Sequence, residues 1–498
     1  MKLLGYATVG ALAPWITSAA SASKSGSCCR ALAKVGRLAG KVVYPDTELY
    51  EDRLDSYWSR SAALEPWCMV LPLTAEDVSS VVKVISKNKC PFGIRSGGHS
   101  QFAGSSSVEE GITIDLGYMN ATSYDPEKKM ASVWPGSMWR DVYATLAPHD
   151  VSIAGGRADL VGVGGFITGG GYSFYLGAYG FACDNVRNFE VVLADGRIVN
   201  ANANENADLW KALKGSSGNL GFVTRFDMDI IESADIWGGS TFYDLSQKDA
   251  VFNAYVEFAE NMASDEQSQA ILHLPYAGEF LLKTILSNGA AVVEPPAFVD
   301  YLDIPSLSST LRSTNISDIT LENSGNQPIG IYANWFVGLY KNDIRIIQFV
   351  DMKHAEYVAK MEAALGPDAV VETLCQFQPL TESSIRHSEL KGGNVLGLEP
   401  LVKDGATQMW LFTVQVYNAE DEAKVIPLAK QFLDEVDEYA DSIGINLNWR
   451  YLNYAYKDQD PIAEYGADAI NTIKAAAAKY DPKGVFQKLR RSGFKIPA

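Results

Sequence analysis

Hydrophobic and polar residues follow a helical rhythm in one part of the first half of the chain and a strand rhythm in the next. Apolar residues at 78, 81, 82, 84 and 85 predict a helix over 76–87 that packs on one face. Asp195-Gly196 lies between two apolar runs within 188–199 and predicts a hairpin turn. Further strands are expected at 91–95, 111–116 and 130–136, a helix at 137–146, and a helix, glycine-rich loop and strand over 208–235.

The pattern changes after about residue 236, where longer strands alternate with longer amphipathic helices. This arrangement predicts a second sheet with helices on one face. Two stretches, 286–330 and 376–408, show no readable pattern. The strands are expected at 270–274, 280–286, 330–338 and 409–417, and the helices at 247–263, 343–364 and 419–440.

The composition is that of an ordinary globular protein. Hydrophobic residues make up 47% of the 498 positions, so the chain is long enough for two or three cores. The formal net charge of −18 would repel a phosphate backbone. Nucleic acid is therefore not expected as a partner.

The N-terminus has the three parts of a signal peptide. Lys2 supplies a positive charge, residues 3–16 are mostly apolar, and small residues up to position 22 offer a cleavage site. We therefore expect residues 1–22 to be a signal peptide and the protein to be secreted or to stay in the lumen of the secretory pathway. A first core helix is the alternative. No later stretch approaches the roughly 18 uninterrupted apolar residues of a membrane-spanning helix, so no membrane partner is expected.

Export would allow disulfide bonds and glycosylation. Of the six cysteines, Cys28 or Cys29 is expected to pair with Cys68 and so tie the N-terminal arm to the first domain. The sequons that begin at Asn120 and Asn315 are candidate glycosylation sites. The histidines are scattered and no Cys-x-x-Cys spacing occurs, which argues against a bound metal.

Two glycine-rich segments are the first candidates for chemistry. One is Arg95-Ser-Gly-Gly-His99-Ser, and the other runs through 155–171. Glycines let a backbone approach a ligand closely and leave amide N–H groups unshielded, which suits a pyrophosphate. The spacing is not that of a Rossmann fingerprint, and there is no Walker lysine or G-x-S-x-G elbow. Close-packed turns are the alternative explanation for these glycines.

The glycine-rich segments belong to a longer series of motifs in a fixed order. After them come Asp184-Asn-Val, Ser217-Gly-Asn-Leu-Gly-Phe-Val, Tyr451-Leu-Asn-Tyr454 and Tyr480-Asp-Pro-Lys-Gly-Val-Phe-Gln487. Over roughly residues 45–498 the series resembles the berberine-bridge-enzyme-like flavoproteins, which have the vanillyl-alcohol-oxidase or PCMH type of FAD-binding fold. Fungal members look most similar.

The resemblance implies an α+β fold in two parts. Residues 45–235 and the C-terminal segment 446–498 would form a PCMH-type FAD-binding domain, and 236–445 an α+β substrate-binding domain with an antiparallel sheet. The implied function is an FAD-linked oxidoreductase that takes a hydride from a small organic substrate, such as a secondary metabolite, with molecular oxygen reoxidising the flavin. A carbohydrate (oligosaccharide) oxidase, a non-redox isomerase or cyclase, and a catalytically silent flavin-binding protein are the alternatives.

His99 is the residue that the resemblance assigns to a covalent bond with the flavin. Many relatives carry a second bond from a cysteine at the position of Ala158, which has no nucleophile, so a single link is expected. Phe166 stands where relatives often place a histidine near the flavin pyrimidine. The other residues that the resemblance assigns to the cofactor are Arg95, Ser96, Gly97, Gly98, Ser100, Pro135, Gly136, Val161, Gly162, Gly164, Gly165, Thr168, Gly169, Gly170, Gly171, Asn185, Gly221, Val223 and Asn453.

Catalytic roles follow from the resemblance for four positions. Val161 would form a gate beside the flavin, where a small side chain admits oxygen. Alternation in 409–417 places Thr413 and Gln415 on one face of a strand, and the position of Gln415 carries a catalytic carboxylate in some family members. Glutamine cannot be a general base. Tyr451 and Tyr454 are therefore the candidate bases, if a nearby positive charge or hydrogen bonding lowers the pKa of the phenol.

Overall fold

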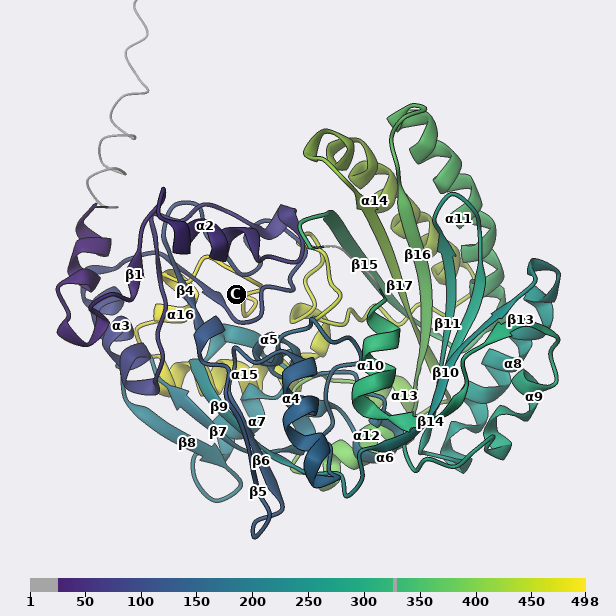
Figure 1. Ribbon diagram of the computed structural model, residues 1–498, viewed down its shortest axis with the longest axis horizontal. Helices are drawn as coiled ribbons and strands as arrows, with labels where there is room; N and C mark the ends of the chain where they lie inside the picture. The colour runs from purple at the N-terminus through teal and green to yellow at the C-terminus, as the bar shows by residue number, and fades with distance from the viewer. Residues whose placement is uncertain (1–25, 326–328) are drawn as a thin grey trace, which may run out of the picture.

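Three sheets flanked by helices make up the computed structural model, which describes residues 26–325 and 329–498 (Figure 1). The fold is α+β, as predicted. The predicted signal peptide lies outside the described residues. No helix in the described part of the chain is long and apolar enough to cross a membrane.

The first sheet is small and lies beside the predicted helix, which is α3 (Ala75–Asn88). The apolar positions predicted for this helix face the core, and the Thr74 side chain caps its first turn. The strands lie in the order β1 (Val42–Val43), β2 (Cys68–Val70), β4 (Ile112–Asp115) and β3 (Phe92–Arg95), with α2 (Glu48–Asp55) nearby in sequence. Strand β3 ends at Arg95, so it delivers the first glycine-rich loop.

The second sheet is antiparallel and contains the predicted hairpin. Its turn is at Asp195-Gly196, where Gly196 has a φ of +84° that side chains disfavour. The strands lie in the order β5 (Thr122–Asp125), β6 (Met130–Val133), β9 (Phe222–Asp229), β7 (Val186–Val192) and β8 (Ile198–Asn202). Helices α4 (Trp139–Leu146), α5 (Val163–Thr168), α6 (Leu176–Tyr179) and α7 (Ala207–Leu213) accompany this sheet.

The third sheet has eight antiparallel strands, all of them from residue 235 onward (Figure 1). Side chains alternate along each strand between the two faces of the sheet. One face packs against helices α8 (Lys248–Asn261), α11 (Ile344–Leu365) and α14 (Ala419–Ser442), and the other faces a cavity. The strands lie in the order β13 (Ser306–Ser309), β10 (Asp235–Tyr243), β12 (Leu282–Asn288), β11 (Ser268–Tyr276), β16 (Glu372–Leu380), β17 (Thr407–Val416) and β15 (Tyr332–Lys341), and β14 (Arg312–Asn315) pairs with β10.

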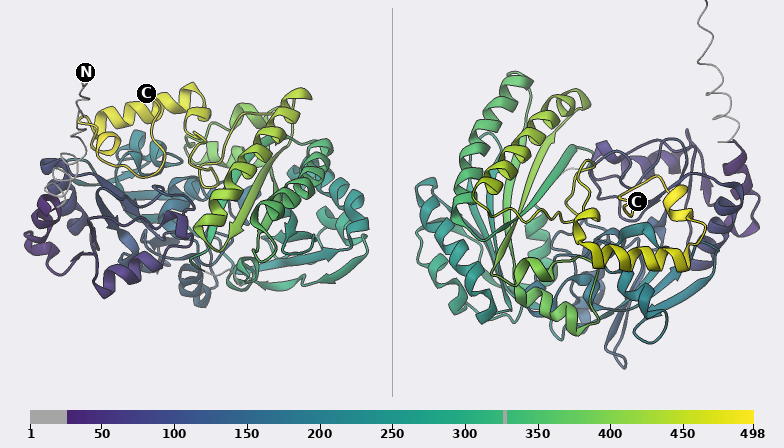
Figure 2. Two further views of the ribbon diagram at one scale, coloured as in Figure 1. Left: turned by 90° about the horizontal axis from the view of Figure 1, so that it is seen from above. Right: turned by 180° about the vertical axis from the view of Figure 1, so that it is seen from behind.

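Several elements were not predicted from the pattern. Strands β10 and β16 complete the large sheet, and helix α10 (Ile316–Ser324) lies in one of the two stretches without a readable pattern. The C-terminal segment returns to the first half of the molecule, where its longest helix packs beside α7 (Figure 2). The remaining helices are α9 (Val299–Leu302), α12 (Glu382–Leu390), α13 (Glu399–Val402), α15 (Ala467–Tyr480) and α16 (Val485–Lys488).

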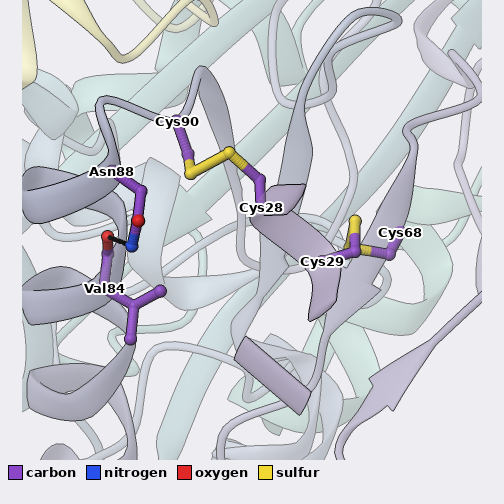
Figure 3. The surroundings of a disulfide bond; sticks show 6 residues. All are labelled: Cys28, Cys29, Cys68, Val84, Asn88 and Cys90. Atoms are coloured by element: carbon purple, nitrogen blue, oxygen red, sulfur yellow. Dashed lines mark hydrogen bonds between the residues drawn. A yellow bond between two sulfur atoms is a disulfide. The ribbon is translucent and has the colours of Figure 1, made fainter. Parts of the chain in front are cut away.

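Two disulfide bonds fasten the N-terminal arm to the first sheet (Figure 3). The expected link to Cys68 is confirmed, with Cys29 as its partner. A second bond, between Cys28 and Cys90, was not expected. It joins the same arm to the chain just after helix α3, so both bonds hold one short segment.

Candidate functional site

A cavity of about 640 Å³ lies between the glycine-rich loops and the large antiparallel sheet. This volume is in the range of cavities that hold cofactors and small ligands. The predicted site residues that line it are Ser96, Gly97, Gly98, His99, Ser100, Pro135, Val161, Gly162, Gly164, Gly165, Thr168, Gly221, Val223, Gln415, Asn453 and Tyr454.

The two glycine-rich segments touch each other at the cavity wall. A Cβ on Gly97 would lie 2.5 Å from Cα of Gly162, so neither residue has room for a side chain. The Gly164 N–H donates to the Ser96 hydroxyl at 3.1 Å, and that hydroxyl in turn donates to the carbonyl of Pro135. Gly165, in contrast, has nothing within 4 Å of an added Cβ and faces open space. The loops therefore bring bare backbone to the cavity.

His99 stacks on Trp58, with the ring centroids 4.6 Å apart. Its Nδ1 atom is buried and has no hydrogen-bond partner. Burial lowers the pKa of His99 to about 4, although hydrogen bonding to the backbone of Leu160 has the opposite, smaller effect. The imidazole is therefore neutral near pH 7. A neutral ring with one unused nitrogen at a cavity wall can act as a nucleophile, so the residue fits the covalent bond expected of it.

Seven of the predicted site residues lie behind the cavity wall rather than on it. Arg95 stacks over the Tyr57 ring at 3.8 Å and lies 3.5 Å from Asp115, so it supports the loop from below. Asn185 donates hydrogen bonds to the carbonyls of Tyr179 and Phe181. The other residues behind the wall are Gly136, Gly169, Gly170, Gly171 and Tyr451.

Close packing accounts for the glycines behind the wall. A Cβ on Gly136 would lie 2.2 Å from the carbonyl oxygen of Leu116, and one on Gly169 would lie 2.0 Å from Oδ1 of Asn453. The triple glycine thus packs against the C-terminal segment. For these positions the close-packed-turn explanation describes the structure better than direct contact with a ligand.

The two candidate bases have different surroundings. The Tyr451 hydroxyl accepts hydrogen bonds from the N–H groups of Gly171 at 2.8 Å and Tyr172 at 3.0 Å, and burial raises its pKa. Tyr454 lines the cavity, and its hydroxyl accepts a hydrogen bond from Nη2 of Arg157 at 3.2 Å. Of the two, only Tyr454 combines access to the cavity with a neighbouring cation.

Arg157 is a functional candidate that sequence reasoning missed. It is buried, lines the cavity and has its guanidinium 4.3 Å from the centroid of the Tyr172 ring. Nη2 also donates to Oε1 of Gln378, and no carboxylate among the described residues lies within ion-pair distance. Its place directly before Ala158 in the glycine-rich segment was the only available signal.

The strand wall of the cavity carries polar side chains. Thr413 and Gln415 share one face of β17, as the alternation predicted, and both line the cavity. Gln415 is paired across the strands with Glu372 of β16 and donates to its carboxylate. His273 of β11 and Lys283 of β12 also line this wall, and neither was identified from the sequence.

Comparison with known proteins identifies the family of this chain. A family model described as an FAD binding domain matches residues 66–202. The FAD-dependent monooxygenase sdcF of Emericella nidulans is 37% identical over 484 residues, which cover 95% of this chain and 99% of that protein. The FAD-dependent monooxygenase drtC of Aspergillus calidoustus is also 37% identical, over 94% of this chain and 90% of its own. The chain belongs to the berberine-bridge-enzyme-like FAD-linked oxidoreductases.

Solved structures show the same fold at low sequence identity. Berberine bridge enzyme superposes with a TM-score of 0.74 at 16% identity, covering 95% of this chain and 98% of its own. Glucooligosaccharide oxidase from Acremonium strictum gives a TM-score of 0.73 at 19% identity, over 95% of this chain and 100% of its own. For 6-hydroxy-D-nicotine oxidase from Arthrobacter nicotinovorans the TM-score is 0.73 at 18% identity, over 92% and 98%. The protein is thus an FAD-linked oxidoreductase by family, and it shares its fold with these three enzymes.

Proposed function

We propose that this protein is an oxidase that takes a hydride from a small organic substrate, such as a secondary metabolite, and holds FAD covalently through His99 alone. The observation that carries the proposal is the buried, unpartnered Nδ1 of His99 on a neutral ring at the cavity wall. Bound FAD would supply the hydride acceptor and pass the electrons to molecular oxygen. The glucooligosaccharide oxidase carries both a cysteinyl and a histidyl link to its FAD, whereas Ala158 offers no sulfur here.

Tyr454 is the residue that we assign to proton removal. Its hydroxyl faces the cavity, so it can reach a substrate O–H or N–H group. The guanidinium of Arg157, 3.2 Å away, would stabilise the negative charge that develops on the phenol oxygen. We expect Tyr451 to position the triple-glycine segment instead, because two backbone N–H groups already occupy its oxygen.

The covalent link is tested by His99→Ala, with His149→Ala as a matched control at a surface histidine. Acid-precipitated wild-type protein and His149→Ala should stay yellow, and the peptide that contains His99 should carry the mass of FAD. His99→Ala should release its flavin into the supernatant. A colourless wild-type pellet with an unmodified His99 peptide would contradict the proposal.

A monooxygenase is the second candidate, because sdcF and drtC are both named FAD-dependent monooxygenases. An oxidase returns both oxygen atoms as hydrogen peroxide, whereas a monooxygenase places one of them in the product. Turnover under ¹⁸O₂ separates the two. Label in the organic product supports monooxygenation. One peroxide per substrate consumed, with no label in the organic product, supports the oxidase.

Export and glycosylation belong to the same proposal. Asn120 and Asn315, the first residues of the two sequons, are exposed, and the two disulfide bonds suit an oxidising compartment. Treatment of the secreted protein with an N-glycosidase should lower its mass. An unchanged mass would remove the glycosylation proposal while leaving the flavin chemistry untouched.

A further inference from the structure

The strand wall of the cavity carries a polar row that the proposed hydride and proton transfers do not use. His273 lies directly opposite Lys283 on one neighbouring strand and opposite Gln376 on the other. All three side chains line the cavity. Leu272 and Leu274, on either side of His273 in sequence, point into the core behind the sheet. The row is therefore fixed by strand register to face the cavity.

Two positively charged side chains affect the imidazole of His273, in the middle of this row. Burial, and then the charges of Lys283 and Arg157, hold the pKa of His273 well below its usual range. Lys283 lies directly opposite His273 on the neighbouring strand, and Arg157 lines the same cavity from the glycine-rich segment. Gln376 lies opposite His273 on the other neighbouring strand, and Nε2 of His273 is buried without a hydrogen-bond partner.

The two cations that line the cavity, Arg157 and Lys283, have few carboxylates to balance them. Glu322 also lines the cavity, but its oxygens accept hydrogen bonds from Arg312 and Thr310 at 2.5 Å each. Asp159 lines the cavity too, and within the described residues no cation lies within 4 Å of it. In the described part of the chain, the cavity thus holds Arg157, from the glycine-rich segment, and Lys283, from the strand wall, against one carboxylate without an ion-pair partner, although the formal net charge is −18.

Arg157 has donors to spare. Nη2 serves both Gln378 and Tyr454, and among the described residues no acceptor bonds Nε or Nη1. A guanidinium that is buried without a carboxylate is costly unless a ligand supplies negative charge. The free edge of Arg157 and the ammonium of Lys283 are therefore the groups to which an anionic ligand in the cavity would bind.

We propose that the substrate carries an anionic oxygen group, a carboxylate or an ionised phenol, which Arg157 and Lys283 bind across His273. This proposal rests on the proposed function, because it names the class of substrate that the enzyme would oxidise. It separates the acidic metabolites from the neutral oligosaccharides, whose hydroxyl groups would leave both cations without a counter-charge.

Ligand binding to the wild-type holoenzyme tests the proposal without turnover. Titration with trans-cinnamate and with its amide, followed by the change in flavin absorbance, compares charged and neutral ligands of one shape. 4-Hydroxybenzaldehyde and its methyl ether make the same comparison for an ionised phenol. We expect at least one acid to bind about tenfold more tightly than its neutral counterpart at low salt, and less so at high salt.

Three variants assign the effect to this wall. Lys283→Met should remove most of the preference for the acid, and Asp159→Asn should increase it. Lys341→Met, which removes an exposed lysine from β15, is the matched control and should change nothing. Equal affinity for acid and neutral ligand, no spectral response to any acid, or a preference that survives in Lys283→Met would each overturn the proposal. None of these results depends on the His99 link, which is read separately by peptide mass.

Discussion

The two walls of the cavity are built on different principles. On one wall, backbone meets backbone: Gly97 and Gly162 come so close that an added Cβ would lie 2.5 Å from the opposing Cα. On the other wall, side chains project from strands β11, β12, β16 and β17, whose spacing is set by sheet hydrogen bonds. Where its two loops touch, the loop wall has no room for side chains, whereas the strand wall can change every second residue without disturbing its backbone.

This difference separates what is common to the family from what is particular to this chain. Close backbone contact does not depend on side-chain identity, so it is compatible with a fold that solved structures share with this chain at only 16–19% identity. Side chains such as His273 and Lys283 can be exchanged to suit a new substrate. We therefore expect substitutions in the loop wall to affect cofactor retention and stability, and substitutions in the strand wall and at Tyr454 to affect turnover or ligand choice.

The largest expected effect comes from Tyr454→Phe, which removes the assigned base from the cavity. We expect kcat to fall by about 10²–10⁴-fold while the flavin content stays unchanged. Tyr451→Phe is the matched control because it removes a hydroxyl behind the wall. It should cost about 1–3 kcal/mol of unfolding free energy, since the N–H groups of Gly171 and Tyr172 lose their acceptor. Full turnover in Tyr454→Phe would end its assignment as the base.

Gly97→Ala tests the backbone contact in the loop wall. The added methyl must push the two loops apart, so we expect a loss of about 1–3 kcal/mol in stability, measured by denaturant unfolding, together with incomplete flavin attachment. Gly36→Ala places the same methyl in open space and should stay within about 0.5 kcal/mol of wild type. Equal stability of the two variants would show that the loops are not in contact.

Val161→Leu tests whether a side chain of the loop wall controls the access of oxygen to the flavin. Val161 lines the cavity and is only partly buried, so a longer side chain would extend into the open space. We expect slower reoxidation of the reduced enzyme by air, followed in a stopped-flow spectrometer, with an unchanged rate of flavin reduction by substrate. Reoxidation at the wild-type rate would remove the gate that we assign to this residue.

The loop wall was more predictable from the sequence than the strand wall. Glycine clusters are local in sequence, so the two glycine-rich segments could be singled out, as could helix α3 and the Asp195-Gly196 hairpin. The contact between the two segments was not predicted. For Gly169–Gly171 the sequence left ligand contact and close packing open as alternatives, because glycines that meet a ligand and glycines that pack against other residues have the same sequence signature.

The strand wall depends on which strands become neighbours, and a single sequence does not encode that locally. Strands β10 and β16 were missed, and without β16 the row from Lys283 through His273 to Gln376 cannot be assembled. The cation beside Tyr454 shows the same limit. The positively charged residues nearest to it in sequence are Arg450 and Lys457, but the one that bonds its hydroxyl is Arg157, 297 positions away.

The smallest expected effect is in the pH dependence of flavin attachment, and it sharpens the comparison because it tests burial at the loop wall. A free histidine has a pKa of about 6.5, and burial lowers that of His99 to about 4. The neutral ring is the nucleophile, so its fraction should stay near one from pH 8 to pH 5 and fall by half only near pH 4. Apoprotein from riboflavin-limited cells, incubated with FAD and assayed for acid-stable flavin, should follow this profile while circular dichroism confirms that it remains folded. A rate that halves near pH 6.5 would show that the His99 ring is solvated before the bond forms. The loop wall would then have to close around the cofactor after it binds, instead of being preformed.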